Sequence, residues 1–111
     1  MNDIHPIVPI PRMREAAGAA TAALRALANE DRLLLLCQLS QGEKSVSELE
    51  ALLEIRQPTL SQQLGVLRSE GLVSTRREGK RIFYAGADPK VLQVLETLYR
   101  LYCPQPTGDA P

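Results

Sequence analysis

Two groups of side chains in this sequence have types and spacings that could do chemistry. The first is a pair of cysteines, Cys37 and Cys103, each placed in a leucine-rich stretch. A thiolate is a nucleophile that exchanges with other sulfur compounds, whereas a buried free thiol behaves as a small hydrophobic side chain. The second is a run of amide and hydroxyl side chains at positions 57–68. Such groups can hydrogen-bond to base edges. From pattern alone, the cysteines fit an inert core and the polar run fits a solvated helix face.

Length and composition limit the classes of protein that these groups can serve. The chain has 111 residues, enough for one domain, and 44% of them are hydrophobic and 23% charged, as in a folded globular protein. No apolar run approaches the roughly 20 residues of a membrane span, and the start of the chain lacks the layout of a secretory signal. Two cysteines are too few for a disulfide-rich scaffold. We therefore expect a cytoplasmic binding domain that contacts no membrane.

Charge is distributed unevenly along the chain, although 13 basic and 13 acidic residues balance overall. Residues 56–81 carry six basic side chains against two acidic ones, whereas the segments before and after are net acidic. A basic segment inside a neutral protein is typical of a nucleic-acid contact surface, although an unevenly charged solvated surface would look the same.

The N-terminal half predicts helices behind a proline-rich arm. Residues 1–13 hold three prolines and are expected to be extended or disordered, and an alanine-rich helix is expected from about Arg14 to Ala28. Asn29 is a suitable N-cap for a second helix that contains Leu33–Leu39. Ser47, with Glu50 three residues later, has the spacing of a capping box for a short third helix.

The C-terminal half predicts one more helix, a hairpin and a last helix. Pro58 is expected to open a helix that Gly71 ends in a left-handed conformation. Two strands are expected at 72–75 and 82–84, joined by a turn at 78–80. A last helix is expected from Asp88, with the tail 104–111 mobile, so residues 14–103 form the single DNA-binding and dimerisation domain.

A helix, a short turn, a second helix and a two-stranded hairpin make a winged helix-turn-helix. The expected fold class is therefore mainly α with a β-hairpin wing. The second helix of this motif enters the major groove, where Gln can bond adenine through two hydrogen bonds, and the wing tip contacts phosphates or the minor groove. The expected DNA-binding residues are Gln57, Thr59, Ser61, Gln62, Gln63, Arg68, Lys80 and Arg81.

Four segments, 28–33, 57–67, 70–73 and 79–84, resemble the ArsR/SmtB family of bacterial repressors. The resemblance extends over roughly residues 14–103, and it implies a homodimer, joined through the first and last helices, that binds an imperfectly palindromic double-stranded operator. Many family members have His where this chain has Gln63, so the base preferred at that position stays open.

Neither standard metal site of this family matches the sequence. Members with a site at the third helix carry Cys-x-Cys at its start, where this chain has Ser45-Val46-Ser47. Members that bind zinc between their last helices use Asp and His, but the only histidine here is His5, in the arm. We therefore expect no metal and no cofactor.

The cysteine pair resembles the dithiol subgroup of this family, whose members sense persulfides and related reactive sulfur species. The shared contexts are Leu-Cys-x-Leu around Cys37 and Leu-Tyr-Cys ending at Cys103. The resemblance implies that a low-molecular-weight persulfide, such as glutathione persulfide, joins the two cysteines by a di-, tri- or tetrasulfide bridge. Bridging would release the operator and derepress genes for sulfide detoxification or sulfur metabolism. Which cysteine attacks first stays open.

Three other functions stay open from the sequence: a dithiol repressor that responds to a metal or metalloid, a repressor that responds to general thiol oxidation, and an interaction module without a DNA role. An enzyme is not expected, because the folded core has no histidine for general base catalysis and the chain has no phosphate-binding glycine motif.

Overall fold

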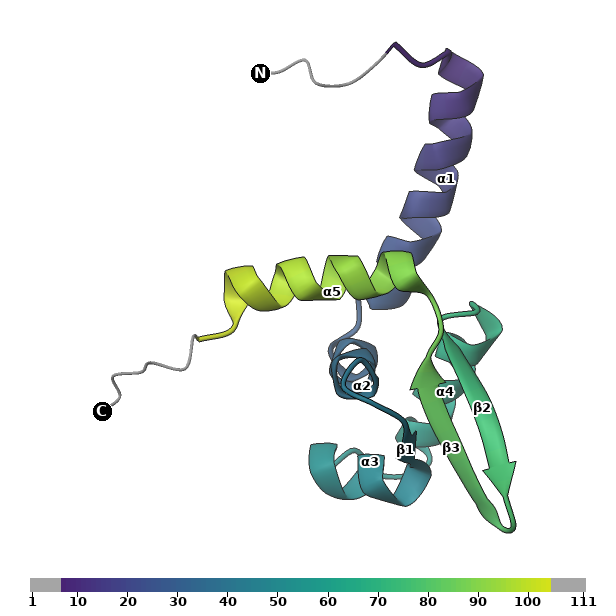
Figure 1. Ribbon diagram of the computed structural model, residues 1–111, viewed down its shortest axis with the longest axis vertical. Helices are drawn as coiled ribbons and strands as arrows, with labels where there is room; N and C mark the ends of the chain where they lie inside the picture. Colours follow the sequence, from purple (N-terminus) through teal and green to yellow (C-terminus); the bar gives the residue numbers. More distant parts are fainter. Residues whose placement is uncertain (1–6, 105–111) are drawn as a thin grey trace.

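The computed structural model describes residues 7–104, which form five helices and a small antiparallel sheet (Figure 1). The elements in chain order are α1 (Ile10–Leu27), α2 (Glu30–Leu39), β1 (Lys44–Ser45), α3 (Val46–Leu53), α4 (Thr59–Ser69), β2 (Val73–Glu78), β3 (Arg81–Gly86) and α5 (Pro89–Tyr102). The winged helix-turn-helix expected from the sequence is confirmed, with α3 and α4 as the helix pair and β2–β3 as the wing. In the described part of the chain, no helix is both long and apolar enough to cross a membrane.

Helix α1 begins earlier than expected. The sequence predicts an extended or disordered arm over 1–13 and a helix from Arg14, but the helix starts at Ile10. Pro11 stands in its first turn, where a missing amide donor has no intrahelical acceptor to lose, so this proline does not stop the helix. Residues 10–13 are therefore helical. The rest of the predicted arm up to residue 6, with His5, and the tail from residue 105 lie outside the described residues.

The cap of α2 is confirmed and that of α3 is shifted. The Asn29 side chain accepts a 3.0 Å hydrogen bond from the Arg32 backbone amide. The capping box of α3 is formed by Ser45 and Glu48, not by the predicted Ser47 and Glu50. Both pairs have the required spacing, but Ser45 leaves strand β1 in an extended conformation, which is the geometry of an N-cap, whereas Ser47 already lies inside the helix.

The end of α4 directs the chain into the wing. Gly71 adopts φ +75°, as predicted, and its amide donates to the carbonyl of Arg68 at 3.0 Å. The amide of Leu72 reaches the carbonyl of Leu67 at 2.9 Å, which completes a Schellman motif. Buried Leu72 and Val73 then lead directly into β2, so the helix and the wing are held at a fixed angle.

The sheet has the strand order β1-β3-β2. Strands β2 and β3 are longer than predicted and are joined by the two-residue turn Gly79-Lys80, where Gly79 has φ +64°. Strand β1 was not predicted, because two residues are too short to show an alternating pattern. Its pairing of Ser45 with Phe83 attaches the start of α3 to the wing.

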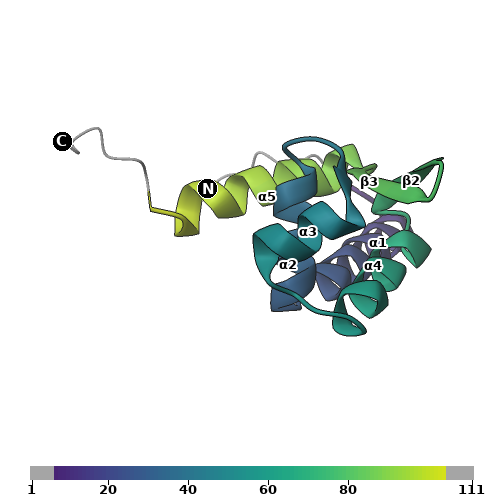
Figure 2. The ribbon, with the colours of Figure 1, turned by 90° about the horizontal axis from the view of Figure 1, so that it is seen from below.

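A leucine core holds α2, α3 and α4 together. The fully buried members are Leu35, Leu36, Leu49, Leu60, Leu64 and Leu67. Burial of each such side chain contributes about 1.5–3 kcal/mol, so these three helices are held together as one packed body. Helix α1 joins the core through its C-terminal end, with Ala26 and Leu27 buried and Ala23 packed against them, and α5 joins it through buried Val91 and Leu95. The other parts of α1 and α5 extend away from the body (Figure 1), and the projection of α5 is also seen in Figure 2.

Candidate DNA interface and cysteine pair

The start of α4 presents most of the predicted polar side chains to solvent. Gln57, Thr59, Ser61, Gln62 and Arg68 are all exposed. The Gln57 side chain accepts hydrogen bonds from the Ser61 amide at 3.1 Å and from the Ser61 hydroxyl at 2.6 Å. Pro58, at the N-cap position, makes no side-chain cap, so Gln57 caps the helix in its place.

Gln63 is placed differently from the other polar residues of α4. It is half-buried, and its side-chain oxygen accepts a 2.8 Å hydrogen bond from the Arg32 guanidinium. A two-bond contact to adenine needs both the oxygen and the nitrogen of the glutamine amide. The structure therefore leaves Gln62 as the glutamine within α4 that is open for such a contact.

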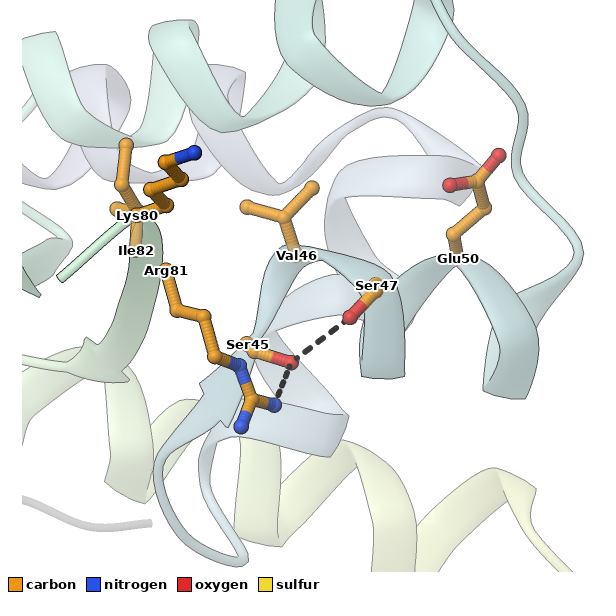
Figure 3. Close-up of a pocket in the computed structure, with 7 residues that line it drawn as sticks. All are labelled: Ser45, Val46, Ser47, Glu50, Lys80, Arg81 and Ile82. Atoms are coloured by element: carbon orange, nitrogen blue, oxygen red, sulfur yellow. Dashed lines mark hydrogen bonds between the residues drawn. The ribbon is translucent and has the colours of Figure 1, made fainter. Parts of the chain in front are cut away.

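The two predicted wing residues also differ from each other. Lys80 is exposed in the hairpin turn, whereas the Arg81 guanidinium turns back toward α3. It donates to the Ser45 hydroxyl at 3.3 Å (Figure 3). It also lies 5.0 Å from the centre of the Phe83 ring. An open pocket of about 310 Å³ between the wing and the start of α3 is lined by Lys80 and Arg81, with Glu50 on its other side. Lys80, in contrast, has no hydrogen-bond or ion-pair partner among residues 7–104.

Arg76 shows how the sequence overcounted the positive charge of the wing. Its guanidinium makes two hydrogen bonds to the Glu43 carboxylate, at 2.9 and 2.7 Å, and lies 3.5 Å from Glu78. These bonds to Arg76 lower the pKa of Glu43. Arg77, the next residue along β2, is exposed. Neutralisation across strands cannot be read from charge counts along the chain.

The two cysteines belong to different helices and differ in exposure. Cys37 is half-buried in α2 against the leucine core, and Cys103 is exposed at the C-cap of α5; both thiols are free. Burial raises the pKa of Cys37, and the charge of Cys103 raises that pKa further. The two thiols therefore differ in their surroundings: the Cys37 thiol is partly withdrawn from solvent, whereas the Cys103 thiol is open to it. In residues 7–104 there is no group of three or more His, Cys, Asp or Glu side chains that could hold a metal ion.

A winged helix whose second helix is polar and whose wing carries free basic side chains defines a DNA-binding module. Comparison with known proteins agrees. Residues 29–75 match the model of the family described as bacterial regulatory protein, arsR family. The chain is 54% identical over 96 residues to the biofilm growth-associated repressor of Agrobacterium fabrum, which covers 86% of this chain and 82% of the relative. The protein belongs to the ArsR family, and it is a DNA-binding transcriptional regulator, not an enzyme.

Solved structures show the same relationship. The transcriptional repressor BigR from Xylella fastidiosa is 45% identical, with a TM-score of 0.81, over 88% of this chain and all of that chain. Reduced HlyU from Vibrio cholerae is 44% identical, with a TM-score of 0.80, over 84% of this chain and 98% of that chain. A winged helix-turn-helix domain from Mycobacterium bovis, described as homodimeric, is 32% identical, with a TM-score of 0.70, over 81% and 83%. The predicted family resemblance is confirmed.

Proposed function

We propose that the protein is a repressor that senses persulfides through Cys37 and Cys103 and releases its operator when the two become bridged. The observation that carries the proposal is the placement of two free thiols on two different helices, one half-buried against the core and one exposed at the end of α5. Repression is the activity named for BigR and for the Agrobacterium fabrum relative.

The exposed thiol is suited to react first. The Cys103 thiolate attacks the outer sulfur of glutathione persulfide, the sulfur–sulfur bond of the reagent breaks, and glutathione leaves as a thiolate. Cys103 is then itself a persulfide. The thiolate of Cys37 attacks the Cys103 sulfur, the terminal sulfur leaves as hydrosulfide, and a disulfide closes. The persulfide is the oxidant, and the two thiol protons pass to the solvent.

Longer bridges need only a further equivalent of the same reagent. A Cys103 persulfide that takes a sulfur from a second glutathione persulfide carries two extra sulfur atoms. Attack by Cys37 on the middle sulfur then leaves a trisulfide and again releases hydrosulfide. A longer chain joins thiols that lie beyond the Cα separation of about 7 Å that a plain disulfide tolerates.

A bridge between α2 and α5 would change the position of the DNA-binding helix α4, because α2 shares its core with α4. Leu35 and Leu36 of α2 are packed in one cluster with Leu60 and Leu64 of α4. When the bridge displaces α2 relative to α5, α4 is therefore displaced together with α2.

We further propose that the protein works as a homodimer joined through α1 and α5. Both helices extend from the body (Figure 1) and carry large apolar side chains that are exposed. Contact of such side chains with water is unfavourable, and groups of them mark interaction surfaces. These side chains are Ile10, Met13 and Leu24 on α1, and Val94, Tyr99, Leu101 and Tyr102 on α5. The homodimeric Mycobacterium bovis domain supports this assembly. Two copies of α4 would then read two half-sites of one operator.

The DNA contacts proposed for each copy are Gln57, Thr59, Ser61, Gln62 and Arg68 on or before α4, with Lys80 at the wing tip. Gln63 and Arg81 are assigned to internal contacts, because each bonds a different element of the fold: Gln63 bonds Arg32 of α2, and Arg81 bonds Ser45 at the start of α3. The bonds between Gln57 and Ser61, in contrast, stay at the start of α4.

The proposal is tested by operator release. A duplex selected from a randomised pool with the reduced protein serves as the operator probe. Glutathione persulfide should release it from the wild type but not from Cys37→Ser or Cys103→Ser, both of which should bind the probe normally when reduced. Release of both variants by persulfide would contradict the proposal. Release of the wild type by arsenite at stoichiometric concentration, without persulfide, would favour a dithiol metalloid sensor instead.

A further inference from the structure

Arg32 forms a polar junction among three helices that the sequence did not predict. It lies in the first turn of α2, and its guanidinium donates to the carbonyl oxygens of Ala26, at 2.6 Å, and Arg25, at 3.1 Å, at the end of α1. Its remaining arm donates to the side-chain oxygen of Gln63 on α4, at 2.8 Å. A planar guanidinium presents several donors in a fixed fork, so one side chain holds both helices at once.

The packing around Arg32 makes α1 and α4 depend on this junction for their relative orientation. An open pocket of about 210 Å³ lies beside Arg32, between α1 and α4, with Arg25 and Ala26 on one side and Val66 and Glu70 on the other. Side chains of α1 and α4 are therefore not closely packed there, and the guanidinium bridges the gap. The Arg32 backbone is itself held in place, because its amide donates a hydrogen bond to the side chain of the N-cap residue Asn29.

We propose that Arg32 is a positioning residue for DNA binding: it sets the orientation of α4 relative to α1, and Gln63 serves as its acceptor rather than as a base-reading side chain. In a dimer joined through α1, the angle between α1 and α4 sets the separation of the two α4 helices. Half-sites must lie about one helical turn of DNA apart, or a multiple of it, so this separation decides which operator spacing fits. The inference rests on DNA binding by α4 and on dimerisation through α1, but not on persulfide chemistry.

The test separates positioning from base reading. The reduced wild type, Arg32→Gln, Gln63→Leu and the double variant are titrated with the selected operator duplex, with a panel of its single base-pair substitutions, and with duplexes whose half-sites are moved one base pair closer or further apart. Gln63→Leu should bind the operator roughly tenfold more weakly, because one hydrogen bond to a charged group is lost. Arg32→Gln should bind at least as weakly, because it also loses the two bonds to the carbonyls at the end of α1. The double variant should bind no worse than the weaker single variant, because both changes break the same bond.

Specificity provides the second readout. Base preference at every position should be unchanged in Gln63→Leu, whereas the preference for the original spacing over the shifted spacings should fall in both single variants. A variant that merely folds less well would lose affinity equally for all spacings. Gln63→Glu keeps an acceptor for Arg32, so it should restore the spacing preference even if the added charge lowers affinity for all duplexes.

Three results would overturn the proposal. The first is a relaxed base preference at one position in Gln63→Leu, and the second is a loss of affinity in the double variant equal to the product of the two single losses. The third is no recovery of spacing preference in Gln63→Glu. If the wild type itself shows no spacing preference, the dimer proposal fails, and the base panel and the double variant still decide the role of Gln63. Gln63→Leu changes a half-buried side chain outside the leucine core, so the experiment does not depend on the folding of Arg32→Gln.

Discussion

The charge of Cys103, at the end of α5, raises the pKa of the half-buried Cys37 thiol in α2. The two residues come from opposite parts of the chain: Cys37 lies within α2, against the core, and Cys103 caps the end of α5. Both are free, but only Cys103 is exposed. From this asymmetry we propose an order of reaction for the pair, which the sequence left open.

The exposed thiol should react first. In Cys37→Ser, glutathione persulfide should convert Cys103 into a persulfide that accumulates, because no second thiol is present to close the bridge. In Cys103→Ser, modification of half-buried Cys37 should be slower under the same conditions. The comparison is made by intact mass at early times after mixing. Faster modification of Cys37 than of Cys103 would reverse the proposed order.

Bridge closure should accelerate with rising pH. The pKa of Cys37 is raised above its ordinary value of 9.0, first by burial and then by the charge of Cys103, so near neutral pH the attacking thiolate is scarce. While the pH is below the pKa of Cys37, each increase of one pH unit should raise the thiolate fraction, and with it the closure rate, about tenfold. The rate is measured by mixing persulfidated protein into buffers from neutral to alkaline pH. A closure rate that is already independent of pH near neutrality would show that Cys37 is ionised there.

Gln62 and Lys80 should contribute to DNA binding in different ways. Gln62→Ala should cost about 1–3 kcal/mol of operator binding and relax the preference for one base pair, because a base-edge contact is lost. Lys80→Gln should weaken binding to all duplexes alike and reduce the slope of log affinity against log salt by about 0.9, the value for one phosphate contact. Titrations of the operator and of its substituted versions at several salt concentrations distinguish the two. An unchanged base preference in Gln62→Ala would remove it from the reading surface.

Leu101 should contribute to the dimer and Leu52 should not. Both leucines are exposed, at 69% and 55% respectively, but Leu101 lies on α5 and Leu52 on α3. Leu101→Glu should therefore shift the protein toward the monomer by placing a charge in an apolar interface, whereas Leu52→Glu is the matched control. Sedimentation equilibrium of the reduced protein measures the difference. Equal dimer dissociation constants for the two variants would place the interface elsewhere.

The sequence predicted those features of the fold that depend on local patterns. The Asn29 cap, the left-handed Gly71 and the hairpin turn each follow from one or two residues whose conformational preferences are strong. The capping box of α3 was assigned to Ser47 because two serine–glutamate pairs have the same spacing. The choice between them depends on β1, and β1 exists only because β3 pairs with it.

The candidate site was harder to predict, because it depends on contacts between distant residues. Gln63 and Gln62 are neighbours of the same type, and only the guanidinium of Arg32, 31 positions away, distinguishes them. Arg76 likewise contributes little free charge because Glu43 pairs with it across the sheet. The cysteines were identified by their contexts, but that one is half-buried and the other exposed emerges from how α5 packs on the core.

The most direct test of persulfide sensing is the intact mass of the reduced protein after exposure to glutathione persulfide, with hydrogen peroxide and oxidised glutathione in parallel. We expect a product that has lost two hydrogens. A plain disulfide adds no sulfur, whereas a trisulfide or tetrasulfide adds one or two whole sulfur atoms. Formation of the product should need both Cys37 and Cys103 and should coincide with release of the operator duplex. An unmodified mass after persulfide treatment, with the operator still bound, would contradict the account and leave both cysteines as structural residues.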